Sequence, residues 1–266
     1  MKKFRKTEIY IFIKNLKNIL VLTFLISVNL NVFAQSKLDL NKEKYFKLEI
    51  NQYDYSVVNS YPQKVLNIKN KKNKSIIKLK THGTLNEKKK DMINDCKYVE
   101  KYLQCSDLID YNTTNIKDVF SKLNLSSMSE YHCAKSILIF ITSVIKYDAE
   151  LAKEISTGLS CGKKASWVLE NKKGTCGEYT NLFIALMRLR GVPCKYVTGL
   201  YYSKNQTFFH AWAEFYDSNK GWIPVDPQGG VLGVSSNHIK LMEGLDYIDT
   251  NFDMAKCDFK IRDITK

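Results

Sequence analysis

Apolar residues recur at helical spacing in several segments, and the clearest of these begins at Cys176. Its apolar positions include Leu182, Ala185, Leu186 and Leu189. Gly191 and Pro193 follow, and a Gly followed by a Pro commonly ends a helix. The pattern therefore predicts a largely buried helix that starts at Cys176, with Thr175 as its capping residue.

Weaker helical patterns precede this helix. Apolar residues at helical spacing predict helices over residues 92–103, 116–123 and 130–146. The segment 148–165 has no clear period and is interpreted as a loop region.

After the helix, the pattern changes to runs of aromatic and β-branched residues, which are typical of strands. We expect strands near 194–202, 207–216 and 221–226, with a polar turn, Asp217–Lys220, between the last two. A further strand is predicted at 259–262. Helices followed by an antiparallel sheet indicate an α+β fold.

The domain organisation follows from these patterns and from the N-terminus. Residues 1–34 contain six basic residues, one acidic residue and an apolar run, which predicts a signal peptide cleaved after Ala34. An uncleaved membrane anchor is the alternative, although ten apolar residues are short for a span. Residues 35–125 are expected to form a β-rich and helical N-terminal region, and residues 126–266 the catalytic domain. We therefore expect an exported protein, periplasmic or secreted.

Basic residues exceed acidic ones, giving a net charge of +14, of which +9 remains without the predicted signal peptide. Much of this charge lies in a predicted hairpin around a turn at 70–75, in Lys69, Lys71, Lys72, Lys74, Lys78 and Lys80. These lysines favour either an anionic partner, such as a cell-envelope surface, or a solvated strand edge that resists aggregation. The chain shows no nucleic-acid recognition motif, so no nucleic-acid partner is expected.

Three residues combine the chemistry of a cysteine acyl-transfer site: the thiol of Cys176, the imidazole of His210 and the carboxylate of Asp226. A cysteine in the first turn of a helix is favoured as the reactive thiolate. If the turn of the predicted hairpin is centred at residue 218, His210 and Asp226 lie directly opposite each other on one face. The alternatives are a buried core cysteine, a strand histidine and a turn-forming aspartate.

The segments GTCGEYTNLFIALMRLRGVPCKYVTGLYY, HAWAEFY and GWIPVDP, which contain these three residues, resemble the core of the transglutaminase-like superfamily. The resemblance extends upstream to 145–148 and downstream to 238–244. It implies a papain-like or transglutaminase-like core, with helices packed on a small antiparallel sheet and a small β-rich N-terminal part. By this resemblance Cys176 is the nucleophile, His210 the general base and acid, and Asp226 the orienting carboxylate.

The oxyanion of such a reaction needs hydrogen-bond donors, and a backbone N–H at the helix start is one candidate. The family often adds a side chain from upstream of the nucleophile. Tyr147 occupies a suitable position, with Trp167 as the second choice, although aromatic packing explains both equally well. His238 is expected to make structural hydrogen bonds.

The resemblance implies cysteine-dependent acyl transfer or hydrolysis at amide bonds of protein or peptide substrates. A cysteine peptidase or amidase of the cell envelope, and a non-catalytic envelope-binding module, are the alternatives. The seven cysteines form no C-x-x-C pair and no metal-ligand cluster, and there is no EF-hand pattern. We therefore expect no cofactor and no metal, and a monomeric protein.

Overall fold

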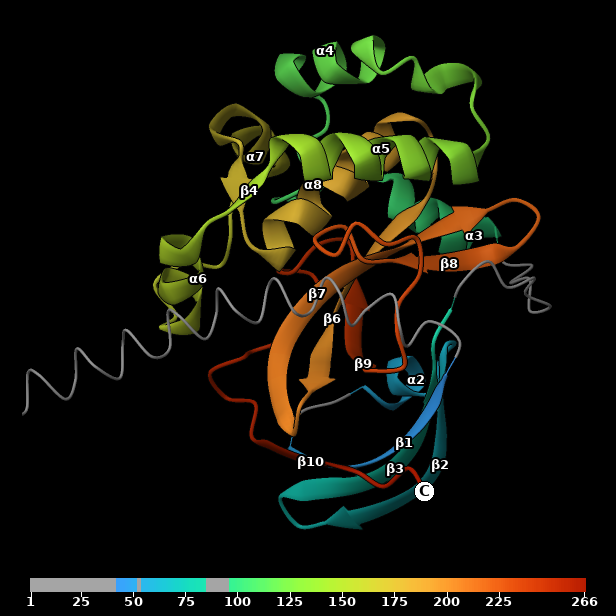
Figure 1. The fold of residues 1–266 in the computed structure, drawn as a ribbon, viewed down its shortest axis with the longest axis vertical. Coiled ribbons are helices and arrows are strands. Elements are labelled where there is room, and N and C mark those ends of the chain that lie inside the picture. Colours follow the sequence, from blue (N-terminus) through green and yellow to red (C-terminus); the bar gives the residue numbers. More distant parts are fainter. Residues whose placement is uncertain (1–41, 52–53, 85–95) are drawn as a thin grey trace, which may run out of the picture.

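The computed structural model describes residues 42–51, 54–84 and 96–266, and it has an α+β fold (Figure 1). The predicted signal peptide lies outside the described residues. Among the described residues, no helix combines the length and apolar character that crossing a bilayer requires.

The C-terminal half of the chain contains a four-stranded antiparallel sheet with the strand order β8-β7-β6-β9. Its strands are β6 (Cys194–Ser203), β7 (Gln206–Asp217), β8 (Gly221–Val225) and β9 (His238–Gly244). Lys204 and Asn205 join β6 to β7 with positive φ angles of 49° and 64°, the backbone that a two-residue hairpin loop requires. The three predicted strands are confirmed as β6, β7 and β8, and the predicted hairpin is β7–β8.

Helices cover one face of this sheet (Figure 1). The central one is α8 (Cys176–Leu189), almost wholly buried, which packs against β7 and against α5 (Glu130–Val144). Outside these lie α4 (Thr114–Lys122) and α7 (Ala165–Asn171). The helices predicted at 116–123, 130–146 and after residue 175 are confirmed. Of the helix predicted at 92–103, the structure describes α3 (Cys96–Glu100) and the 3-10 turn Lys101–Leu103.

The interpretation of 148–165 as a loop region is wrong, because it contains the helix α6 (Ala149–Ser156). The Asp148 carboxylate caps this helix by accepting the Leu151 N–H at 3.1 Å. Leu151 is buried and Ile155 is half-buried, so the helix packs on the protein through a short apolar stripe on one side. A pattern of two turns is too short for a helical period to be distinct.

A second four-stranded sheet is formed at the opposite end of the molecule, in the order β10-β1-β3-β2 (Figure 1). It comprises β1 (Glu43–Ile50), β2 (Gln63–Lys71), β3 (Lys74–His82) and β10 (Phe259–Asp263). The predicted lysine-rich hairpin is therefore β2–β3, and the predicted last strand is β10. The chain's final strand completes a sheet of its first strands, and the division of the chain at residue 125 stays a prediction.

The remaining elements are short connections. They are α2 (Tyr55–Val58), the 3-10 turn Leu125–Ser127, and the two-residue parallel strands β4 (Lys146–Tyr147) and β5 (Lys173–Gly174). The pairing of β4 with β5 holds Tyr147 beside Gly174, two residues before Cys176.

Candidate active site

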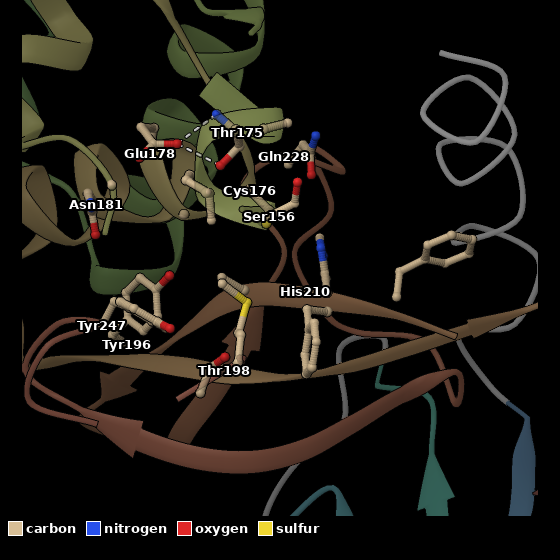
Figure 2. Close-up of a pocket in the computed structure, with 18 of the residues that line it drawn as sticks. Ser156, Thr175, Cys176, Glu178, Asn181, Tyr196, Thr198, His210, Gln228 and Tyr247 are labelled. Carbon is tan, nitrogen blue, oxygen red and sulfur yellow. Dashed lines mark hydrogen bonds between the residues drawn. The ribbon is translucent and has the colours of Figure 1, made fainter. Parts of the chain in front are cut away.

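Cys176 is the first residue of α8, and its side chain is half-buried. Thr175 is the N-cap, and the Glu178 carboxylate accepts hydrogen bonds from the Thr175 backbone N–H at 2.8 Å and from its hydroxyl at 2.6 Å (Figure 2). These bonds belong to a capping box between Thr175 and Glu178, which fixes the start of the helix. Backbone N–H groups in a first helical turn lack helical acceptors, so the thiol lies where an oxyanion can be bound.

Glu178 is buried and also joins this helix start to the preceding loop. Its other oxygen accepts the backbone N–H of Lys163 at 2.9 Å. A Cβ on Gly174 would lie 2.3 Å from the Glu178 Cβ, so only glycine fits there. Glu178 thereby joins the backbone just before Cys176 to the backbone of Lys163.

His210 on β7 and Asp226, just after β8, are both buried, with the His210 Nε2 3.0 Å from the Asp226 Oδ2. The prediction that they are directly opposed is wrong. Ala213 pairs with Val225, a register that places Asp226 beyond the end of the ladder and diagonal to His210. Because this differs from the expected register by an even step, both side chains still share one face.

The hairpin turn explains the register. Asp217 accepts the backbone N–H groups of Asn219 and Lys220 at 2.9 and 3.0 Å. Gly221 adopts a φ of +76° and pairs with Asp217. The loop therefore consists of the three residues 218–220 and is centred at Asn219, one residue later than the predicted centre at residue 218.

Two further side-chain contacts hold Asp226 in place. Its Oδ1 accepts the backbone N–H of Gly229 at 2.9 Å, and its Oδ2 lies 3.4 Å from the Nε2 of His238 on β9. The Nδ1 of His238 accepts the Ser235 backbone N–H at 3.2 Å. A neutral His238 in this position carries its proton on Nε2 and donates it to Asp226. The predicted structural role of His238 is therefore that of a second donor to the same carboxylate.

Electrostatics separate the two histidines. Burial opposes protonation of His210, but the charge and hydrogen bond of Asp226 outweigh it, and with a contribution from Cys176 they raise the pKa of His210 to about 10. Burial lowers the pKa of His238. Asp226 is buried as well, yet its two histidine neighbours hold its pKa well below the usual range. The cluster therefore contains one imidazolium, one carboxylate and one neutral imidazole.

Cys176 and His210 line the same cavity, which has a volume of about 400 Å³ (Figure 2). The Nε2 of His210 is directed to Asp226, so Nδ1 is the ring nitrogen left to interact with the thiol. Aromatic rings surround the imidazole: it stacks on Trp212 at 6.2 Å between centroids and meets the edge of Tyr201 at 6.0 Å. These rings exclude water from the imidazole and so strengthen its charge interaction with Asp226.

The oxyanion candidates differ in position. Tyr147 lines the cavity. Trp167 is not among the lining residues. The amino groups of Lys163 and Lys173 lie over its ring, 5.7 and 6.0 Å from the ring centroid. The role of Tyr147 stays a prediction.

Several lining residues were not identified from the sequence. Ala152, Ile155 and Ser156 come from α6, which was interpreted as a loop. The Tyr196 hydroxyl lies 3.2 Å from where a Cβ on Gly177 would be, and burial raises its pKa well above the ordinary value, so it remains a donor. The Thr-x-x-Glu spacing of Thr175 and Glu178 is a capping-box signature that could have revealed Glu178.

Within the described part of the chain, the group of side chains with metal-ligand spacing is His210, Asp226 and His238, whose ligand atoms lie within 4.8 Å of one another. These atoms are already hydrogen-bonded to each other, with both imidazoles directed at one carboxylate oxygen. Six cysteines are free thiols: Cys105, Cys133, Cys161, Cys176, Cys194 and Cys257.

Residues 118–227, a stretch that includes Cys176, His210 and Asp226, match the model of the transglutaminase-like superfamily. A search of curated protein sequences gave no match.

Solved structures resemble this chain to different degrees, and the first one below shares its fold. A candidate cysteine protease from Cytophaga hutchinsonii superposes with a TM-score of 0.60 at 14% identity, over 85% of this chain and 92% of that chain. The ethylmercury-bound periplasmic domain of TgpA from Pseudomonas aeruginosa gives 0.46 at 14% identity, over 72% and 76% of the two chains. Red sea bream transglutaminase gives 0.35 at 12% identity, over 69% and 46%.

Proposed function

We propose that the protein is an exported thiol acyltransferase or amidase that acts on amide bonds of protein or peptide substrates, with Cys176 as nucleophile. The observation that carries the proposal is that Cys176 and His210 line one cavity, while His210 is hydrogen-bonded to Asp226 behind it. A thiol, an imidazole and an orienting carboxylate are the parts of a cysteine acyl-transfer site.

In the first step, the Cys176 sulfur forms a bond to the amide carbonyl carbon, after the thiol proton has passed to His210. The carbon–nitrogen bond breaks, and His210 gives its proton to the leaving amine. Asp226 orients the ring and stabilises its protonated form, consistent with the raised pKa of His210. The backbone N–H of Cys176, with Tyr147 as a side-chain donor, stabilises the oxyanion.

In the second step, the thioester is resolved by water or by a primary amine. The attacking group loses its proton to His210, and the thiol is regenerated. Water as acceptor gives an amidase or peptidase, and a lysine amine gives a transglutaminase.

The test is incubation with a glutamine-containing peptide, with and without a primary amine, followed by mass analysis of the products. Amine incorporation identifies a transglutaminase, deamidation an amidase and backbone cleavage a peptidase. Cys176→Ala should abolish every product. Cys161→Ala is the matched control, because Cys161 is the other cysteine that lines the cavity, and it should retain activity. Equal activity of the two variants would refute the proposal.

A further inference from the structure

The sheet β10-β1-β3-β2 has one apolar and one basic face. Phe46, Leu48, Ile77 and Leu79 are fully buried against Leu200 and Ile239 of the other sheet. The residues between them point outward, because side chains alternate along a strand. The outward basic residues, which we call the basic face, are Lys47, Lys64, Lys69, Lys71, Lys74, Lys78, Lys80, Lys260 and Arg262.

Strand register places like charges directly opposite each other on this face. Lys47 on β1 pairs with Lys78 on β3 and with Arg262 on β10, forming a row of three cations across three strands. Lys64 is opposite Lys80 in the same way. Directly opposed like charges are destabilising, because their Cβ atoms lie only about 4.5–5.5 Å apart. The basic face therefore costs the fold stability.

Carboxylates offset little of this charge. Glu49 lies 3.4 Å from both Lys47 and Lys74, and Glu43 lies 2.6 Å from Lys80. Lys78 and Arg262 have no ion pair with a carboxylate in the described ranges.

Protection of a strand edge explains the cations on β2 and β10 but not those on β1 and β3. Lysines protect a sheet where a strand has an unpaired edge, and the edge strands here are β2 and β10. Lys47 and Lys78 lie instead on β1 and β3, which are paired on both sides. Of the two interpretations open from the sequence, the register favours an anionic partner.

We propose that the basic face docks on the surface of an anionic phospholipid bilayer. The cations extend in two dimensions, about 14 Å across four strands and about 20 Å along β3, as a planar partner requires. Lysine predominates, and a lysine acts as a point charge without the bidentate geometry by which arginine recognises one particular phosphate. Among the described residues of these strands, Tyr45 is the one outward Phe, Tyr or Trp, which disfavours base stacking with a nucleic acid.

The proposed docking does not obstruct the candidate active site. None of the residues that line the cavity belongs to β1, β2, β3 or β10. Substitutions on the basic face should therefore change membrane binding without changing activity, and binding can be measured independently of whether the protein is an enzyme.

The experiment is co-sedimentation of the full chain with phosphatidylcholine vesicles, with and without about one quarter phosphatidylglycerol, at about 0.1 M salt. The test variant is Lys47→Gln/Lys78→Gln/Arg262→Gln. The control, Lys117→Gln/Lys122→Gln/Lys135→Gln, removes the same charge from exposed positions on α4 and α5. Both variants keep the N-terminal apolar segment, so any membrane affinity of that segment contributes equally to both and does not affect the comparison between them.

The basic-face variant should bind anionic vesicles on the order of 100-fold more weakly than the control variant, since each cation near such a surface contributes about fivefold. Its Tm should be unchanged or higher, because opposed charges are removed. Equal binding by the two variants would overturn the proposal, as would equal wild-type binding to neutral vesicles. Wild-type binding to soluble dextran sulfate but not to vesicles would assign the face to an anionic polymer instead.

Discussion

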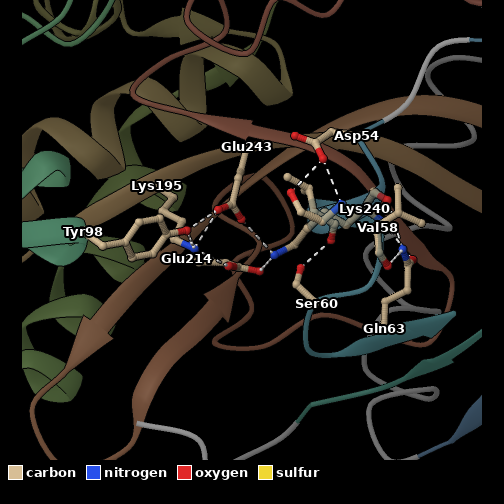
Figure 3. A network of polar contacts seen from close by, with 11 residues as sticks. Asp54, Val58, Ser60, Gln63, Tyr98, Lys195, Glu214, Lys240 and Glu243 are labelled. Atoms are coloured by element: carbon tan, nitrogen blue, oxygen red, sulfur yellow. Dashed lines mark hydrogen bonds and ion pairs between the residues drawn. The ribbon is translucent and has the colours of Figure 1, made fainter. Parts of the chain in front are cut away.

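Two buried polar clusters lie on one face of the sheet β8-β7-β6-β9, and they differ in the balance between the number of basic groups and the number of carboxylates. His210, Trp212 and Glu214 alternate along β7, so they share a face, with Trp212 between the clusters. On one side of Trp212 is the cluster of His210, Asp226 and His238. On the other side is a network of lysines and glutamates (Figure 3).

The network on the Glu214 side is balanced, with two cations and two anions. Lys240 pairs with Glu214 and with Glu243, and Lys195 lies 2.9 Å from Glu243. The Tyr98 hydroxyl donates to Glu243 at 2.7 Å, and the Trp222 ring covers the Lys195 amino group at 4.2 Å. Burial raises the pKa of Glu243, but the two lysines outweigh it and lower the pKa to about 2. Every charge is compensated, and none of these residues lines the cavity.

The cluster on the His210 side has two imidazoles but one carboxylate. Only one ring can take the positive charge that Asp226 stabilises, and the pKa values of His210 and His238 move in opposite directions. Titratable groups with separated pKa values beside a cavity are typical of acid–base chemistry. We infer that the balanced network stabilises the fold and that the unbalanced cluster performs the reaction.

The largest expected effect separates the clusters by activity. Asp226→Asn should lower kcat/KM by about 10³–10⁴-fold, because His210 loses the charge that orients and protonates it. Circular dichroism should show a folded protein. An Asp226→Asn variant with near wild-type kcat/KM would remove the basis for distinguishing the two clusters.

The second prediction makes the same isosteric change in the balanced network. Glu214→Gln leaves Lys240 buried with one ion-pair partner fewer, and should lower the free energy of unfolding by about 3 kcal/mol. Denaturant unfolding measures this loss. Per folded molecule kcat/KM should be unchanged, and a loss comparable with that of Asp226→Asn would place Glu214 in the reaction.

His238 provides a smaller test within the unbalanced cluster. His238→Phe removes a donor to Asp226 and should lower kcat/KM by about 10- to 100-fold through misplacement of the carboxylate. His238→Gln can still donate from its side-chain nitrogen and should recover part of the activity. Equal losses in both variants would show that ring packing, rather than the hydrogen bond, is what matters.

The smallest effect is on pH dependence. The pKa of His210 is raised from its ordinary 6.5 to about 10, so the imidazolium persists at neutral pH, and kcat/KM should fall as pH rises through about 10. The stability gained from the raised pKa should be complete below pH 6.5 and be lost over the same rise. In Asp226→Asn, the alkaline limb of the pH–rate profile should move to lower pH, because burial alone lowers the pKa. An unmoved limb would assign it to another group.

Much of the site could be predicted because its signals are local. The apolar period and the Gly–Pro stop mark α8 and place Cys176 at its start, and the polar turn marks the β7–β8 hairpin. The register was missed because it depends on the positive φ of Gly221 and on the hydrogen bonds of the Asp217 side chain.

The remaining parts depend on contacts distant in sequence. His238 reaches Asp226 because β9 pairs with β6, after a connection that no local pattern specifies. The lysines and glutamates of the balanced network come from three strands. Only their mutual pairing offsets the desolvation penalty of burying these charges. The opposed cations of the basic face likewise depend on the register of β10, β1 and β3.

The central claim is that Cys176 is a nucleophile activated by His210. The most direct measurement is the rate of iodoacetamide alkylation at neutral pH, in wild type and in His210→Ala. Mass spectrometry measures this rate separately for each cysteine. Cys176 should react faster than Cys161 and faster than a free cysteine, and it should lose this advantage in His210→Ala while Cys161 is unaffected. Alkylation of Cys176 at the rate of a free cysteine, or at the same rate in both proteins, would contradict the account.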